Sequence, residues 1–243
     1  MHVKIIINDI KLNYEVSGVG PPLIWLHGWG GNLHTFDNLT RQINEDFTVY
    51  QIDLPGFGES VLYDSYTIED CADLINEFCN KLNIIEPVLL GHSFGGRVAI
   101  VYASKYEIKK LILVSAPGIK EKFNLKKYIK IKLYKLSKKL HFNIHMGSTD
   151  YKNSNDILRK TLVMAVNNDL SLFVNKISCP TLLIYGKKDK TVPLYIGQKI
   201  HKMINGSGLV VVKKCGHFPY IEKFRFFFIT IKSFLHSDTL WLV

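Results

Sequence analysis

A serine flanked by glycines, in the segment GHSFGG at residues 91–96, is the clearest candidate for chemistry. An apolar run precedes the segment and a helical pattern follows it, which is typical of a strand-to-helix turn that lifts a serine hydroxyl clear of a sheet. Side chains at Gly91 and Gly95 would collide with neighbouring backbone, so glycine is expected at both positions. The following helix would also favour negative charge that develops at the serine. We therefore predict that Ser93 is a nucleophile.

A serine hydroxyl is a weak nucleophile at neutral pH, so it needs a base, and the base needs an acid to orient it. Of the nine histidines, His217 stands in a loop after the last apolar run, from where it can reach the edge of a sheet. Asp189 follows an earlier apolar run, 96 residues after Ser93 and 28 before His217. We predict a relay of these three residues. The alternatives are a structural loop histidine and a turn aspartate that caps the helix at Pro193.

A glycine-rich loop, HGWGG at residues 27–31, also follows an apolar run and can point its amides at a substrate oxygen. We expect the backbone amides of Trp29 and of Phe94, the residue after the serine, to form the oxyanion hole. The Trp29 side chain either lines the acyl pocket or belongs to the core, and His27 is expected to shape the site through a hydrogen bond. Arg97 either binds an anionic substrate or forms a salt bridge on its helix. The residues expected to contact substrate are His27, Gly28, Trp29, Arg97 and Phe218.

Short apolar runs recur along the chain, and helical patterns separate them. Each run is too short for a helix and almost wholly apolar, as strands are when both faces of a parallel sheet are buried. The segments 2–7 and 11–16 alternate instead and predict an antiparallel hairpin. We predict an α/β fold with a doubly wound, mostly parallel sheet. The runs are Leu23–Leu26, Thr48–Ile52, Pro87–Leu90, Leu111–Val114, Thr181–Tyr185 and Leu209–Val212, and the helices 67–82, 94–106, 194–204 and 219–235.

The segment 118–176 breaks this alternation, because helical spacing replaces the strand runs there. We predict a helical cap at 118–176, inserted into an α/β core made of 1–117 and 177–243, over the strand ends where an open sheet binds ligands. Residues 119–178 contain thirteen Lys and Arg against four Asp and Glu, and nine of the lysines lie between Lys120 and Lys139. This charge belongs to a solvated helix face, or it binds an acidic protein or an anionic membrane.

The composition sets further limits on the class of protein. The chain has 243 residues, 47% of them hydrophobic, and a formal net charge of +10, which suits a single folded α/β protein. Its four cysteines lack metal-ligand spacing, so we expect small core residues in a reducing compartment, with no metal and no organic cofactor. No apolar run is long enough for a transmembrane helix, and no secretory signal is recognisable. We expect a cytoplasmic protein that acts on a small molecule and does not bind nucleic acid.

The motifs HGWGG, DLPGFGES, GHSFGG, GKKDKTVP and CGHFPYIEK occur in the order and spacing of the α/β-hydrolase superfamily, which the chain resembles over nearly its whole length. The resemblance implies an eight-stranded, mostly parallel sheet, a helical cap after the sixth strand, and a catalytic triad of Ser93, Asp189 and His217. Epoxide hydrolases and haloalkane dehalogenases of this superfamily have an aspartate where this chain has Ser93, which argues against those activities. Carbon–carbon bond hydrolases usually have a tryptophan after the histidine, where this chain has Phe218.

The function that this resemblance implies first is a serine hydrolase that cleaves a carboxylic ester or thioester through an acyl-enzyme on Ser93. The HGWG motif is also similar to the oxyanion loop of the pimeloyl-carrier-protein methyl ester esterases of biotin synthesis, whose basic cap binds an acidic acyl carrier protein. Two further alternatives are a ligand receptor that has this fold and hydrolyses slowly, and a carbon–carbon bond hydrolase.

Overall fold

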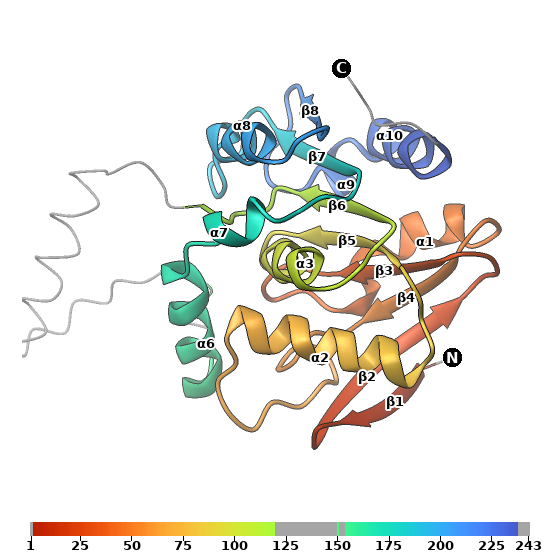
Figure 1. The fold of residues 1–243 in the computed structure, drawn as a ribbon, viewed down its shortest axis with the longest axis vertical. Coiled ribbons are helices and arrows are strands. Elements are labelled where there is room, and N and C mark those ends of the chain that lie inside the picture. Colours follow the sequence, from red (N-terminus) through yellow and green to blue (C-terminus); the bar gives the residue numbers. More distant parts are fainter. Residues whose placement is uncertain (1, 120–149, 151–153, 238–243) are drawn as a thin grey trace, which may run out of the picture.

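The computed structural model describes residues 2–119, 150 and 154–237. Within them the chain forms an eight-stranded sheet with the strand order β1-β2-β4-β3-β5-β6-β7-β8. Antiparallel pairing joins β1 to β2 and β2 to β4, whereas the remaining neighbours are parallel. The predicted fold class, a mostly parallel sheet flanked by helices, is confirmed (Figure 1).

The N-terminal hairpin consists of β1 (His2–Ile7) and β2 (Ile10–Ser17). Ile7 pairs with Ile10, so that Asn8 and Asp9 alone make the turn. Their φ angles are 46° and 64°, and a two-residue turn with positive φ at both positions matches the twist of the strands that it joins. Asn and Asp adopt this conformation more readily than other residues with side chains, which explains why the chain reverses here.

The inner strands are short and buried, because helices cover both faces of the sheet. Every residue of β5, β6 and β7 is buried, which explains why these runs read as continuously apolar rather than alternating. The predicted runs agree with the strands to within two residues at either end. The strands are β3 (Pro22–Leu26), β4 (Thr48–Ile52), β5 (Val88–His92), β6 (Lys110–Val114), β7 (Thr181–Gly186) and β8 (Gly208–Val212).

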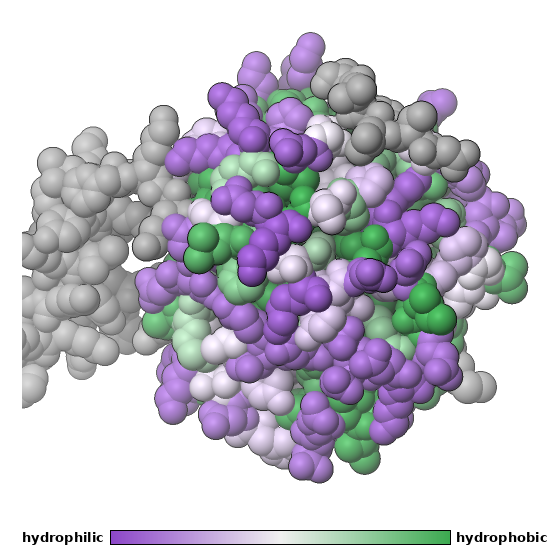
Figure 2. Space-filling model, in the orientation of Figure 1, coloured by the Kyte–Doolittle hydropathy of each residue, from purple (hydrophilic) through white to green (hydrophobic). Residues whose placement is uncertain are grey.

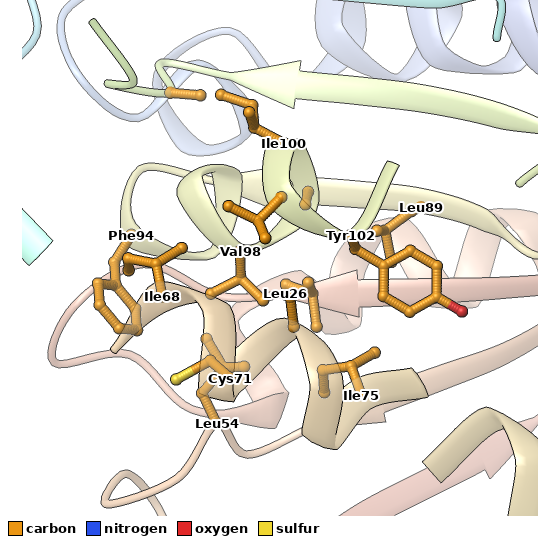
Figure 3. Packing of buried hydrophobic residues seen from close by; sticks show 14 of the residues in the cluster. Leu26, Leu54, Ile68, Cys71, Ile75, Leu89, Phe94, Val98, Ile100 and Tyr102 are labelled. Atoms are coloured by element: carbon orange, nitrogen blue, oxygen red, sulfur yellow. The ribbon is translucent and has the colours of Figure 1, made fainter. Parts of the chain in front are cut away.

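Helices pack on the two faces of the sheet and build two core clusters (Figure 1). One cluster contains side chains of α2 (Ile68–Lys81), α3 (Phe94–Lys105) and α8 (Leu194–Met203). The other contains side chains of α1 (Asp37–Ile43), α9 (Pro219–Glu222) and α10 (Phe224–His236). Figure 3 shows how Ile75 of α2 and Val98 of α3 meet Leu26 of the sheet. This packing fixes α3, which begins directly after Ser93.

The start of α2 is a capping box formed by Thr67 and Asp70. Thr67 Oγ1 accepts the Asp70 amide at 3.1 Å, and Asp70 Oδ2 accepts the Thr67 amide at 2.9 Å. Each bond satisfies an amide that the first helical turn leaves without a partner. The helix therefore begins at a defined residue and presents its apolar face to α3 and the sheet.

Part of the predicted cap lies within the described residues, as α6 (Asp156–Asn167) and α7 (Ser171–Val174). Both helices lie beyond the end of the sheet to which β5 and β6 point (Figure 1). The Leu170 amide donates to the Gly118 carbonyl at 2.7 Å, which joins the segment that enters the cap to the segment that leaves it. The predicted basic helix Lys120–Lys139 lies outside the described residues, and the cap boundaries 118–176 stay a prediction.

Two local elements differ from the sequence-based expectation. The predicted helix 219–235 is two helices, because Lys223 between α9 and α10 has φ −141° and ψ 46°, outside the helical region. Apolar spacing also does not predict the 3-10 helix η1 (Leu33–Phe36) and α1, which follow β3. The Asn32 side chain accepts the His34 amide at 3.1 Å and so caps η1, a local signal that short helices share with ordinary turns.

The molecular surface in Figure 2 is mostly hydrophilic on the face shown, and its apolar residues form small separate groups. None of the helices in the described part of the chain is long and apolar enough to cross a membrane.

Candidate active site

Ser93 stands between the end of β5 and the start of α3, with φ 50° and ψ −111°. A residue with a side chain rarely has positive φ, and the strain costs on the order of 1–3 kcal/mol that surrounding structure must offset. Two backbone hydrogen bonds hold the turn in place. The Ser93 amide donates to the Val114 carbonyl at 3.0 Å, and the Gly95 amide donates to the His27 carbonyl at 3.1 Å. The turn is therefore fixed to β6 on one side and to the loop after β3 on the other.

The glycines of this turn allow backbone segments to approach closely. A Cβ atom on Gly91 would lie 2.4 Å from the Gly95 carbonyl oxygen, and one on Gly95 would lie 2.3 Å from the Leu26 carbonyl oxygen. These neighbours are backbone atoms of strands and a helix, which cannot move aside as the end of a side chain can. The predicted physical reason for both glycines is confirmed.

Ser93, His217 and Asp189 meet where β5, β7 and β8 end. His217 Nε2 lies 3.1 Å from Ser93 Oγ, and His217 Nδ1 lies 2.8 Å from Asp189 Oδ2. Because a carboxylate only accepts, Nδ1 carries the proton and Nε2 presents its lone pair to the serine hydroxyl. The structure thus brings the three predicted residues into one chain of hydrogen bonds, with an acceptor for the Ser93 proton.

The Asp189 carboxylate also orders the turn before α8. Its second oxygen, Oδ1, accepts the Thr191 amide at 2.8 Å and the Val192 amide at 2.9 Å. Burial by itself would raise the pKa of the Asp189 carboxyl. The hydrogen bonds from His217 and from these two amides outweigh burial and hold the pKa below its ordinary value. Asp189 is therefore ionised at neutral pH and fixed in orientation.

The loop that carries His217 packs directly on the loop that carries Asp189. The Lys188 amide donates to the Cys215 carbonyl at 2.8 Å. Gly186 at the end of β7 allows this contact, because a Cβ atom there would lie 2.0 Å from the Gly216 carbonyl oxygen. A side chain at position 186 would push the histidine away from its aspartate.

His92, the residue before Ser93, contacts the His217 loop. His92 Nε2 lies 3.0 Å from the His217 carbonyl oxygen, so Nε2 carries the proton. His92 Nδ1 can then accept the Tyr220 hydroxyl at 3.4 Å. Burial lowers the pKa of His92 to about 3, which keeps the ring neutral at neutral pH. Sequence reasoning missed this role of His92 and Tyr220, because the contact joins residues 125 positions apart.

The loop after β3 lies beside the nucleophile turn. The Trp29 ring packs edge-on against the Phe57 and Phe94 rings, with centroid distances of 4.9 and 5.1 Å. Phe94 opens α3, and the first amides of a helix have no acceptor within it. The Trp29 amide has no acceptor among the described residues either. Both amides therefore remain able to bind a ligand oxygen, and their assignment to an oxyanion hole stays a prediction.

His27 is buried within this loop. Its Nε2 accepts the Leu54 amide at 3.0 Å, so its Nδ1 carries the proton and donates to the Gly28 carbonyl at 2.8 Å. Burial lowers the pKa of His27 to about 4. His27 shapes the loop through hydrogen bonds, and neither ring nitrogen is left for a substrate. Gly28 lies against the end of β5, and a Cβ atom on Gly28 would be 2.5 Å from His92 Nδ1.

Comparisons with known proteins agree with this geometry. The sequence model of the family described as the alpha/beta hydrolase fold matches residues 21–138. A pimeloyl-[acyl-carrier protein] methyl ester esterase from Wigglesworthia glossinidia brevipalpis is 30% identical to this chain, over 88% of this chain and 93% of that protein. This chain belongs to the α/β-hydrolase superfamily.

Further relatives of this α/β-hydrolase are also esterases. A protein of the same name from Neisseria meningitidis is 26% identical, over 87% of this chain and 92% of that protein. The solved structure of an esterase from Exiguobacterium antarcticum has a TM-score of 0.82 and 25% identity, over 98% of this chain and 100% of that chain. The protein is an ester-hydrolysing enzyme.

Two other predicted substrate contacts lie at different places in the α/β-hydrolase. Arg97 is buried, and its Nη1 donates to the Asn168 carbonyl at 3.2 Å. The Asn168 side chain donates to the Glu69 carboxylate of α2 at 3.1 Å, so Arg97 helps to join the end of α6 to the core. Phe218 is 44% exposed, and its ring centroid lies 5.1 Å from that of His217. The substrate contacts themselves stay predictions.

A buried aspartate outside the relay supports the loop after β3. Asp53 follows β4 and accepts the Leu33 amide at 2.7 Å, the Glu59 amide at 2.8 Å and the Asn13 side chain at 2.8 Å. Gly58 leaves room for this carboxylate, since a Cβ atom there would lie 2.1 Å from Asp53 Oδ2. Three donors offset the cost of burying the charge. Asp53 therefore has a structural role in the α/β-hydrolase.

The four cysteines are free thiols, and three of them are buried. Burial raises the pKa of Cys71 to about 12 and that of Cys79 and Cys215 to about 11, which keeps these thiols protonated and unreactive. The prediction that they are small core residues is confirmed for these three. In the described part of the chain, no group of three or more His, Cys, Asp or Glu residues is placed to hold a metal ion.

Proposed function

We propose that this α/β-hydrolase cleaves a carboxylic ester or thioester through an acyl-enzyme on Ser93. One observation carries the proposal: the His217 ring lies between Ser93 Oγ at 3.1 Å and Asp189 Oδ2 at 2.8 Å. Acyl transfer by a serine requires a nucleophile, a base and an orienting acid in this order of contact. Loops after three different strands supply them here.

Acylation begins when His217 Nε2 accepts the Ser93 hydroxyl proton and Ser93 Oγ bonds to the ester carbonyl carbon. The His217 Nδ1–H group stays bonded to Asp189, whose negative charge stabilises the imidazolium. His217 then gives its Nε2 proton to the leaving alcohol oxygen as the carbon–oxygen bond breaks. The acyl group remains on Ser93, and neither a metal nor an organic cofactor takes part in these steps.

Deacylation repeats the same steps with water as the nucleophile. His217 Nε2 accepts a proton from water and returns it to Ser93 Oγ as the acyl group leaves as a carboxylic acid. The former carbonyl oxygen is negatively charged in both tetrahedral intermediates. The amides of Trp29 and Phe94 are the proposed donors to this oxygen, and the positive end of the α3 dipole adds to them.

The test of this proposal is hydrolysis of short p-nitrophenyl esters by Ser93→Ala, with the exposed Ser233→Ala on α10 as a matched control. We expect Ser93→Ala to lose activity by on the order of a million-fold and Ser233→Ala to keep it. Both variants should have wild-type circular dichroism. Comparable turnover by Ser93→Ala and the wild type would overturn the proposal.

A second, narrower candidate is the hydrolysis of a methyl ester carried by an acidic acyl carrier protein. The relatives that are 30% and 26% identical carry the name of that activity. Residues 119–178 also contain nine more basic than acidic residues, which suits an acidic partner. Most of this segment lies outside the described residues, so the support is the relatives and the charge.

The salt dependence of turnover separates the two candidates. We expect kcat/KM for a carrier-linked methyl ester to fall steeply as salt rises, and kcat/KM for the same acyl methyl ester without carrier to change little. Lys127→Glu in the predicted cap segment should weaken only the carrier-linked reaction, and Lys109→Glu on the core is the matched control. Equal salt dependence for both substrates would count against a carrier partner and leave the esterase proposal intact.

A further inference from the structure

Glu222 bridges the two amides on either side of His217. Glu222 Oε2 accepts the Gly216 amide at 2.8 Å, and Oε1 accepts the Phe218 amide at 3.2 Å. Hydrogen bonds to a charged acceptor are stronger than those between neutral groups. One carboxylate therefore fixes the peptide planes both before and after the proposed general base.

The local fold explains how Glu222 reaches these amides. Pro219 starts the single turn of α9, and the amides of Ile221 and Glu222 both donate to the Phe218 carbonyl at 2.9 Å. The turn brings the Glu222 side chain back toward the loop from which the helix begins. A Cβ atom on Gly216 would lie 3.0 Å from Glu222 Oε1, so the absence of a side chain there lets the carboxylate approach.

The carbonyl between the two amides is held from the opposite side. The His217 carbonyl oxygen accepts His92 Nε2 at 3.0 Å, from the last residue of β5. The Cys215 carbonyl accepts the Lys188 amide at 2.8 Å. Four consecutive residues, 215–218, thus each have a backbone group bound to an element outside the loop or to α9. The backbone dihedral angles φ and ψ of His217, which set the direction of its side chain, therefore have little freedom.

We propose that Glu222 is a positioning residue for the general base: it keeps His217 Nε2 in line with Ser93 Oγ without touching substrate. The inference rests on the proposed function of Ser93 and His217. A displacement of about 1 Å in a reacting group can cost about 100-fold in rate. Loss of the Glu222 carboxylate should therefore reduce kcat far more than it changes substrate binding.

The experiment compares Glu222→Ala and Glu222→Gln with Glu77→Gln, a matched change at an exposed glutamate of α2. We expect Glu222→Ala to lower kcat by roughly 10- to 100-fold, with KM for a short p-nitrophenyl ester within about twofold of wild type. Glu222→Gln keeps one carbonyl oxygen for one amide but turns an NH2 group toward the other, so it should fall between Ala and wild type. Glu77→Gln should match the wild type.

Two further readouts separate positioning from general stability. Hydrogen exchange at the Gly216 and Phe218 amides should speed up in Glu222→Ala, while amides of β5 keep their protection. The downfield proton resonance of His217 Nδ1–H should broaden or disappear, since the hydrogen bond to Asp189 is no longer held in one geometry. The glutamine side chain has nearly the shape of glutamate, so Glu222→Gln tests the positioning role if Glu222→Ala does not fold.

The inference would be overturned by wild-type kcat in folded Glu222→Ala, or by wild-type kcat in Glu222→Gln when Glu222→Ala does not fold. A loss of kcat no greater than the loss of folded protein would overturn it as well. An increase in KM without a fall in kcat would also overturn it. These results differ from a failure of the proposed function, which would appear as retained activity in Ser93→Ala. If Ser93→Ala is inactive and the Glu222 variants are fully active, only the positioning role is wrong.

Discussion

The nucleophile turn, residues 91–95, and the histidine loop, residues 215–218, place their side chains by different physical means. The nucleophile turn is strained, with φ 50° at Ser93, and it is held by backbone that packs against backbone. In the histidine loop none of the residues has positive φ. Side chains from elsewhere, His92 and Glu222, hold that loop through hydrogen bonds to its peptide groups.

The two regions should differ in the substitutions that they tolerate. Close packing of backbone leaves no room for even one methyl group, so the nucleophile turn depends on which positions lack a side chain. Hydrogen bonds can be removed one at a time without a clash, so the histidine loop should lose accuracy gradually. The proposed nucleophile is thus fixed by the fold itself, and the proposed base is fixed by individual side chains.

Among the changes that leave Ser93 in place, the largest effect should follow from Asp189→Asn, in the loop after β7. The amides of Thr191 and Val192 donate to Asp189 Oδ1 in the wild type. They should donate in the same way to the carbonyl oxygen of the asparagine side chain. The asparagine NH2 group would then face His217 Nδ1 and select the tautomer whose proton points at Ser93. We expect kcat/KM to fall by on the order of ten thousand-fold with little change in Tm. Retention of more than a tenth of the activity would contradict the relay.

Gly95→Ala should destabilise the nucleophile turn. The added Cβ atom would lie 2.3 Å from one carbonyl oxygen and 2.5 Å from another, so we expect a loss of about 3 kcal/mol in the free energy of unfolding. Gly30→Ala is the matched control, because its φ of 72° is unfavourable but no atom lies within 4 Å of the new Cβ. That variant should lose only about 1 kcal/mol. Urea unfolding of both variants checks this, and equal losses would show that close packing is not the reason for Gly95.

The two buried histidines predict how stability depends on pH. Burial lowers the pKa of His27 to about 4 and that of His92 to about 3, below an ordinary value of about 6.5. The unfolded chain therefore binds more protons than the folded chain below about pH 6.5, so stability falls as pH is lowered from there toward 4 and 3. The Asp189 carboxyl, whose pKa is lowered from 3.8, contributes stability that is lost only below that value.

Measurements of Tm between pH 7 and pH 4 test this expectation. We expect the free energy of unfolding to fall by a few kcal/mol across this range. His27→Gln should have a smaller slope, because one of the two groups no longer titrates. A Tm that stays constant from pH 7 to pH 4, or a slope unchanged in His27→Gln, would contradict the neutral, buried state of these rings.

The smallest effect should come from His92→Phe in the support of the histidine loop. Phenylalanine keeps a ring in the same space but leaves the His217 carbonyl without its donor. We expect kcat to fall roughly 10-fold and stability to fall by about 1–2 kcal/mol. Steady-state kinetics and thermal unfolding of the same preparation measure both. If kcat is unchanged while stability falls, the bond stabilises the loop without positioning the base.

The sequence predicts the nucleophile turn well, because its reasons are local. Gly91, Ser93 and Gly95 lie within five residues, and the collision of a side chain at either glycine follows from the shape of a strand-to-helix turn. Asp189 and His217 are also predictable, since each stands in a loop directly after a strand that ends at the same edge of the sheet.

The histidine loop is predicted less well, because its supports come from contacts that no spacing reveals. His92 and the His217 carbonyl are 125 residues apart, and only the strand order brings them together. Glu222 stands within the motif CGHFPYIEK, five residues after His217. The role of Glu222 can be recognised only when it is known that α9 ends at Glu222. The helical pattern of apolar residues continues past this point from Pro219, so the sequence does not predict where α9 ends.

The central claim is that Ser93 is the nucleophile of a relay with His217, and labelling with a fluorophosphonate tests it most directly. Mass spectrometry after trypsin should find one adduct per chain on the peptide 82–97, in which Ser93 is the only serine. Ser93→Ala should not be labelled, and His217→Ala should be labelled much more slowly. An adduct on another peptide, or equal labelling of Ser93→Ala and the wild type, would contradict the account.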